Sequence, residues 1–117
     1  MLYALIGRPT AKLDGGDPPS DLHDVLEAER AKTAEYRQRG VLHGLWLFAD
    51  HKGALLLCKA DTREDAQAIS AAYPMVQAGY ITHEIHRLQP DAVAEQQQRP
   101  DRLIASLGLT AIHHKST

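Results

Sequence analysis

The chain has 117 residues, of which 44% are hydrophobic and 24% are charged, and these proportions fit one globular domain and exclude a disordered chain. Its 13 basic and 15 acidic residues give a net charge of -2 and are mixed along the sequence, which excludes the clustered positive charge that nucleic acid binding needs. One cysteine excludes an internal disulfide, and no apolar run is long enough for a membrane span or a signal peptide, so a cytoplasmic location is expected by default.

The first part of the chain predicts a strand, a loop and a long helix. Residues 2–8 form a short apolar run that is typical of a strand. Residues 14–19 contain two glycines and two prolines, which favour a loop. From Leu22 to Tyr36, apolar residues recur at helical spacing with charged residues between them, and Gly40 supplies the left-handed position that closes a helix.

The second part predicts a hairpin, a second helix and a last strand. Two apolar runs, 41–49 and 54–60, flank a polar turn that ends in glycine, which favours a β-hairpin. Residues 62–65 resemble a capping box, and Pro74 ends the helical pattern that follows it. Residues 80–88 predict the last strand.

The order β-α-β-β-α-β predicts an α+β domain of the ferredoxin-like type, with an antiparallel sheet, over residues 1–90. Residues 91–117 are interpreted as a C-terminal arm that is partly helical. The helices of this fold cover one sheet face, whereas the hairpin strands are apolar on both faces, as in Leu55, Leu56 and Leu57. A homodimer or higher homo-oligomer that pairs the open faces is therefore expected, and the alternative is that the arm covers the face.

Glu29 lies on the apolar stripe of the long helix, where a carboxylate faces the sheet or its edge. Because burial of an unpaired charge costs free energy, Glu29 either has a partner or has a raised pKa. One interpretation is a general acid or base in a pocket between helix and sheet. The other is a salt bridge at the rim, to Arg8 or Arg87.

Residues 83–86 include two histidines three positions apart and look like a metal motif. In a strand, however, residues three apart point to opposite faces, so no metal site is expected. His83 shares a face with Ile81 and Ile85. It either converges with Glu29 as a proton-transfer pair or is a core histidine bonded to the backbone.

Further candidates come from the strands and from the aromatic residues. His43 alternates with leucines along the second strand, so it either lines a cavity or lies near the strand end. Trp46 is expected to be buried, either as a pocket wall for a planar ligand or as core packing. Tyr3 and Tyr36 are candidate substrate-binding residues, although nothing in the sequence ranks the tyrosines. Cys58 is interpreted as a core residue rather than a nucleophile.

Two stretches resemble the muconolactone isomerase family. Residues 27–31 and 39–46 are similar to that family's helix with an acidic-basic doublet, followed by a glycine and a strand motif ending in Leu-Trp. The resemblance spans about residues 20–90, the extent of one domain. It implies a dimeric α/β barrel in which a proton moves α or γ to the carbonyl of a small lactone. On the matched positions, it implies that Glu29 acts on the proton and that Trp46 walls the pocket.

The leading hypothesis is a cofactor-independent isomerase or cyclase that moves a proton on a small lactone, enone or polyketide-like substrate. Glu29 would move the proton, and His83 or His43 would assist. No nucleotide cofactor or metal is expected, because the sequence lacks a phosphate-cradling glycine loop and zinc-ligand spacing. One alternative is a non-catalytic small-ligand-binding or assembly module. A further alternative is a cofactorless monooxygenase, which would consume oxygen.

Overall fold

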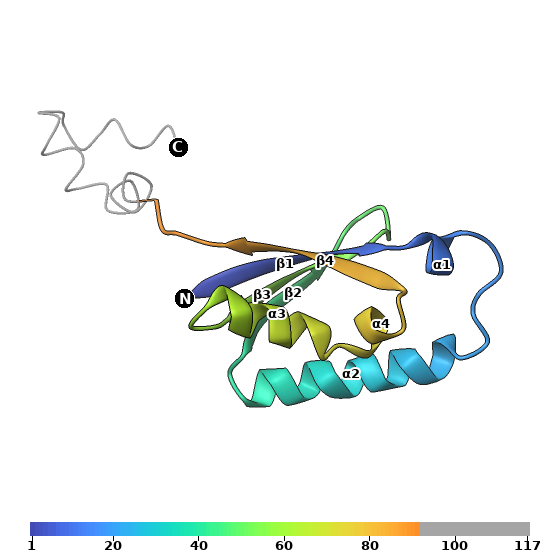
Figure 1. The fold of residues 1–117 in the computed structure, drawn as a ribbon, viewed down its shortest axis with the longest axis horizontal. Helices are drawn as coiled ribbons and strands as arrows, with labels where there is room; N and C mark the ends of the chain where they lie inside the picture. The colour runs from blue at the N-terminus through green and yellow to red at the C-terminus, as the bar shows by residue number, and fades with distance from the viewer. Residues whose placement is uncertain (92–117) are drawn as a thin grey trace, which may run out of the picture.

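A computed structural model describes residues 1–91, and its elements follow the predicted order with two short helices added (Figure 1). The elements are β1 (Leu2–Pro9), α1 (Ala11–Asp14), α2 (Leu22–Gln38), β2 (Leu42–Leu47), β3 (Ala54–Lys59), α3 (Arg63–Ala71), α4 (Pro74–Gln77) and β4 (Ile81–Arg87). Beyond its first residue, the predicted arm lies outside the described residues. The division of the chain at residue 90 therefore stays a prediction.

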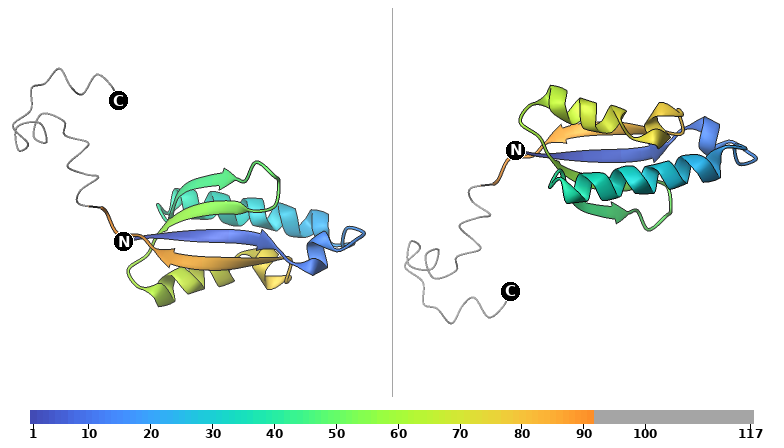
Figure 2. Two further views of the ribbon diagram at one scale, coloured as in Figure 1. Left: turned by 90° about the horizontal axis from the view of Figure 1, so that it is seen from above. Right: turned by 90° about the horizontal axis from the view of Figure 1, so that it is seen from below.

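The four strands form one antiparallel sheet in the order β2-β3-β1-β4. Helices α2 and α3 lie side by side on one face of this sheet, and no described element covers the other face (Figure 2). Because α2 joins β1 to β2 and α3 precedes β4, both connections cross the same face. The predicted α+β ferredoxin-like fold is confirmed.

The antiparallel register places side chains in rows across the sheet, and one row forms the centre of the core. Leu45, Leu56, Leu5 and Ile85 stand side by side in this row, one from each strand, on the face that the helices cover. Leu5 is fully buried, and Tyr73, between α3 and α4, packs into the same cluster. Large side chains from all four strands therefore fill the space under the helices at this level.

The two short helices were not predicted from the sequence. The capping box is confirmed, since the backbone N–H of Asp65 donates to Thr62 Oγ1 at 3.1 Å. Pro74 does not simply end this helix, because α3 ends at Ala71 and Pro74 begins α4. An N–H at the first position of a helix has no acceptor within the helix, so proline costs no hydrogen bond there. The turn after α4 is tied to α1, because the Thr10 hydroxyl donates to the carbonyl of Gly79 at 2.6 Å.

A β-bulge at His43 breaks the alternation predicted for the second strand. The register with β3 shifts between Leu42 and Gly44, so His43 is an extra residue that the ladder leaves without a cross-strand partner. Leu42 is buried in the core, whereas His43 is exposed. The prediction that His43 alternates with the leucines of this strand is wrong, because the bulge brings Leu42 onto their face instead.

The uncovered face of the sheet is apolar on three strands and polar on β4. Trp46, Leu55 and Ile6 stand in one row on this face, and Glu84 ends the row. The Trp46 ring lies over Gly44 and is 54% exposed. The prediction that Trp46 is buried is therefore wrong for the single chain, because the helices lie on the opposite face.

The position of Leu5 yields a test of the fold. Leu5→Ala should lower the free energy of unfolding by about 2–5 kcal/mol, because the substitution leaves a void in the middle of the core row. Urea denaturation followed by circular dichroism measures this change. Leu47→Ala is the control, since Leu47 is 75% exposed and should lose much less. Equal losses for the two variants would contradict the observed placement of the core.

Candidate functional site

Next to the core row on the helix-covered face lies a second row that has small side chains at its centre. The register aligns Leu47, Ala54, Gly7 and His83 in this row. An alanine and a glycine at its centre leave open the space that leucines occupy one row away. The hairpin turn also approaches β1 closely here: a Cβ on Gly53 would collide with the carbonyl oxygen of Gly7. A cavity under α2 follows from these small side chains.

The cavity has a volume of about 290 Å³ and lies between α2, the start of α4 and one end of the sheet. This volume is close to the lower limit of small-molecule sites, about 300 Å³, and suits a ring-sized ligand. Its walls are mainly aliphatic, with a few polar groups. The lining residues are Gly7, Pro9, Leu13, Leu26, Glu29, Thr33, Leu45, Leu47, His51, Gly53, Ala54, Leu56, Tyr73, Met75, Ile81 and His83.

Glu29 lines this cavity from α2. Its Oε1 accepts a hydrogen bond of 3.0 Å from the backbone N–H of Met75 in the first turn of α4. Burial raises the pKa of the Glu29 carboxyl, and the bond from Met75 offsets part of the rise. The salt bridge to Arg8 or Arg87 that the sequence left open is not formed, since Glu29 makes no ion pair within residues 1–91. Glu29 is therefore a half-buried carboxyl suited to gaining and losing a proton.

His83 lines the same cavity from β4. Its Nδ1 lies 2.7 Å from Ser70 Oγ of α3, and its ring packs edge-on against Tyr73 with centroids 5.9 Å apart. Burial lowers the pKa of the imidazole, so the ring is neutral at pH 7. The other nitrogen, Nε2, has no hydrogen-bond partner among the described residues and is not fully enclosed. That nitrogen is available to a ligand as a donor or an acceptor, depending on the tautomer.

Tyr73 packs against His83 from the core side. Its hydroxyl is buried beside Thr33 and makes no hydrogen bond of normal geometry within the described chain. Burial is the main reason that the pKa of Tyr73 is raised, so the phenol stays protonated at neutral pH. The ring contacts both Tyr36 and His83 edge-on, which holds the imidazole against β4.

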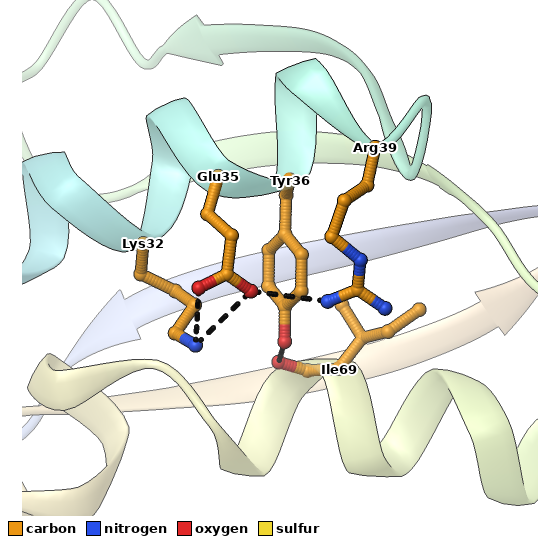
Figure 3. A network of polar contacts seen from close by, with 5 residues as sticks. All are labelled: Lys32, Glu35, Tyr36, Arg39 and Ile69. Carbon is orange, nitrogen blue, oxygen red and sulfur yellow. Dashed lines mark hydrogen bonds and ion pairs between the residues drawn. The ribbon is translucent and has the colours of Figure 1, made fainter.

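The structure brings two of the six candidate residues, Glu29 and His83, into the cavity. Tyr36 serves packing instead: its hydroxyl donates to the carbonyl of Ile69 at 3.2 Å, and its ring lies beside Lys32 and Arg39 (Figure 3). A larger groove of about 600 Å³ runs next to Tyr36, but it is more open to solvent than the cavity.

The other three candidates lie away from the cavity for separate reasons. Tyr3 is buried in the core, 3% exposed, under the helices. His43 sits on the bulge, and Trp46 lies on the opposite face of the sheet. Within the single described chain, none of the three lines the cavity.

Three contributors to the site were missed in the sequence. Ser70 holds His83, Met75 supplies the N–H that binds Glu29, and His51 lines the cavity from the hairpin turn. Strand and helix periodicity could have indicated Ser70, which lies on the buried side of α3. No pattern pointed to Met75, because its role depends on the backbone of a helix of only four residues.

Residues 1–91 offer no metal site, no membrane-spanning helix and no activated thiol. No cluster of three or more histidine, cysteine or acidic residues could hold a metal ion there. None of the helices described combines the length and the apolar character that crossing a membrane requires. Cys58 is fully buried, and burial raises the pKa of its thiol to about 11, which disfavours a nucleophilic thiolate.

Comparison with known proteins relates the chain to others by fold. No protein-family model and no curated protein sequence matches it. The structure of muconolactone isomerase matches with a TM-score of 0.65 and 18% identity, covering 79% of this chain and 92% of that one. A second match is 5-chloro-2-hydroxyhydroquinone dehydrochlorinase from Burkholderia phenoliruptrix in complex with 2,5-dihydroxybenzoquinone, with a TM-score of 0.55 and 14% identity. That match covers 78% of this chain and 96% of the other. At these identities the likeness shows a shared fold.

The raised pKa of Glu29 predicts how stability depends on pH. The folded protein holds this proton more tightly than the unfolded chain does, so protonated Glu29 favours folding. That contribution is complete below the ordinary pKa and is lost as pH rises through the raised value. Glu29→Gln removes the titration and keeps an oxygen for the N–H of Met75. The variant should therefore gain stability relative to the wild type as pH rises to neutral, as measured by urea denaturation at several pH values.

The matched control for this experiment is Glu27→Gln. Glu27 lies on the same helix but is exposed and paired with Arg30 at 2.6 Å. Its substitution should not reproduce the pH-dependent gain. A stability difference between Glu29→Gln and the wild type that stays constant with pH would show that burial does not perturb Glu29.

Proposed function

We propose that the chain is a cofactor-independent isomerase or cyclase that moves a proton on a small ring substrate, with Glu29 as the proton carrier. The observation that carries this proposal is that Glu29 and His83 line one apolar cavity. Burial shifts their pKa values toward each other, raising that of the acid and lowering that of the base. Such a pair offers a carboxylate base together with a neutral imidazole at the same pH.

The proposed step needs no co-reactant. Ionised Glu29 takes a proton from a carbon next to the substrate carbonyl, or conjugated with it, and the electron pair of that C–H bond moves toward the carbonyl oxygen. His83 Nε2, when it carries the proton, donates a hydrogen bond to that oxygen. Glu29 then returns the proton to another carbon, so the product has the same atoms as the substrate. Ser70 and Tyr73 act as positioning residues that orient the imidazole.

The similar structures support the same class of chemistry. Muconolactone isomerase and the dehydrochlorinase are both named for reactions of small ring compounds, and each shares this fold. Because one fold supports many activities, the residues of the cavity carry more weight than the names. We further propose that the chain is a distant member of the muconolactone isomerase family.

Glu29→Gln tests the proposed reaction. The wild type should catalyse exchange of solvent deuterium into members of a panel of small lactones and enones, followed by NMR in heavy water. Loss of the general base should slow this exchange by at least about 100-fold. Glu27→Gln, on the exposed side of α2, should exchange at the wild-type rate. An unchanged rate in Glu29→Gln would refute the assignment of Glu29 as the proton carrier.

Oxygen uptake distinguishes the remaining alternatives. An isomerase or cyclase consumes no oxygen, so an oxygen electrode should record no uptake while exchange proceeds. Uptake that depends on the substrate would instead favour the cofactorless monooxygenase. Binding without exchange or oxygen uptake across the panel would favour the non-catalytic ligand-binding module.

We also propose that a second copy of the chain covers the open sheet face. Trp46, Leu55 and Ile6 form an apolar row there, next to Leu57 in the following row. Contiguous apolar surface of this kind is unusual on a monomer, and a two-fold pairing of the same face would bury it twice. The polar residues on β4 would then border the contact.

The dimer can be followed through the fluorescence of Trp46, the sole tryptophan. Raising the protein concentration should shift its emission to shorter wavelength as the ring leaves water, in parallel with dimer formation in analytical ultracentrifugation. Leu57→Glu should abolish both changes, because it places a charge in the contact. Gln67→Glu adds the same charge on exposed α3 and should leave both unchanged. Dimerisation that persists in Leu57→Glu would contradict this contact.

A further inference from the structure

The charge of the cavity limits what it can bind. Among the described residues, the lining contains no lysine and no arginine, and Glu29 is its one acidic group. The lining also contains two histidines: His83, which is neutral at pH 7 because burial lowers its pKa, and His51, which lies on the exposed hairpin turn. The cavity therefore offers a negative or neutral carboxyl but no lysine or arginine charge within residues 1–91.

Two of the cations next to lining residues in sequence, Lys12 and Arg8, are engaged elsewhere. Lys12 donates to the carbonyl of Ala78 at 2.8 Å and lies over the Tyr80 ring. Arg8 lies over the Phe48 ring, 4.9 Å from its centroid. These contacts hold Lys12 and Arg8 away from the cavity walls, and Lys52, between His51 and Gly53, is exposed on the hairpin turn and does not line the cavity.

Lys32, one turn beyond Glu29 on α2, is also held away from the cavity. It pairs with Glu35 at 3.3 Å and lies over the Tyr36 ring (Figure 3). Arg30 is exposed and pairs with Glu27 at 2.6 Å. The basic residues of α2 around Glu29 therefore compensate surface carboxylates, not a ligand.

The backbone donor at the start of α4 is occupied as well. The N–H of Met75 already donates to Glu29 Oε1 at 3.0 Å, so it is not available to a ligand. A ligand carboxylate in this mainly aliphatic cavity would be repelled by ionised Glu29 and would lose part of its hydration.

We infer that the cavity takes an uncharged ring carrying hydroxyl or carbonyl groups, and that it discriminates against ring carboxylates. One oxygen of such a ligand hydrogen-bonds His83 Nε2, and a hydroxyl or an acidic C–H faces Glu29. The aliphatic walls contact the two faces of the ring. This inference rests on the proposed function for the role of the site, but it concerns binding and is tested separately from turnover.

A matched pair of probes tests it by isothermal titration calorimetry at neutral pH. A dihydroxybenzamide and the dihydroxybenzoate of the same substitution pattern have similar shape, and the second carries a negative charge. The wild type should bind the amide at least about tenfold more tightly, the ratio that 1.4 kcal/mol of unfavourable charge interaction produces. Equal or tighter binding of the benzoate, or no measurable binding of the amide, would overturn the inference.

Two variants and a control test whether the discrimination arises in the cavity. Leu26 lines the wall one turn before Glu29, so Leu26→Lys places a cation there and should reduce or reverse the preference for the amide. Leu26→Met keeps the wall apolar and should retain the wild-type ratio. Glu29→Gln removes the like charge and should improve benzoate binding relative to the amide, even if Leu26→Lys fails to fold. An unchanged ratio in Glu29→Gln would place the discrimination outside this cavity.

Failure of the catalytic proposal gives a different result from failure of this inference. If Glu29→Gln exchanges deuterium as fast as the wild type while the amide remains preferred, the neutral-ligand site stands and the proton-transfer role falls. If exchange depends on Glu29 but the benzoate binds as well as the amide, the catalytic role stands and the inference about charge is overturned.

Discussion

The antiparallel register of β1 against β3 and β4 is the constraint on which the rest of this structure depends. It aligns Leu5 with leucines and an isoleucine in one row and aligns Gly7 with Ala54 and His83 in the next. Because side chains alternate between faces, a slip of one residue would turn His83 toward the open face and bring Glu84 under the helices. The packed core and the cavity thus both result from this strand pairing. They lie at neighbouring rows of the helix-covered face, two residues apart along each strand.

The pKa values of the two buried titratable groups in the cavity follow from their surroundings. Glu29 and His83 are neither paired with each other nor neutralised by a neighbouring charge among the described residues, so desolvation dominates the pKa of both. Each group makes one hydrogen bond, with a backbone N–H in one case and with a serine hydroxyl in the other, and the Tyr73 ring also packs against the imidazole. Those contacts fix orientation without restoring the hydration that burial removes, so the pKa of Glu29 stays raised and that of His83 stays lowered.

The parts that the sequence predicted well were those with an unambiguous period. The helix that carries Glu29 has charged residues on one side and apolar residues on the other, so the position of that carboxyl followed from spacing. The strand that carries Trp46 is apolar on both faces, and alternation could not decide which face meets the helices. His43 was misplaced because a bulge adds one residue without a sequence signal, and α4 was missed because Pro74 both stops one helix and starts the next.

The cavity exists because the side chains at its centre are small, and this affects which substitutions the protein can accept there. Gly7 has little spare room, because a Cβ there would press on the imidazole of His83 at 3.2 Å. Ala54 in the same row faces the cavity, so larger aliphatic residues at this position would shrink its volume while the strand pairing stays the same. The size of the ligand that fits can therefore diverge among descendants of this chain by single substitutions in β3, without altering the titratable groups. A scaffold of this kind lets the shape of the cavity evolve separately from its polar groups.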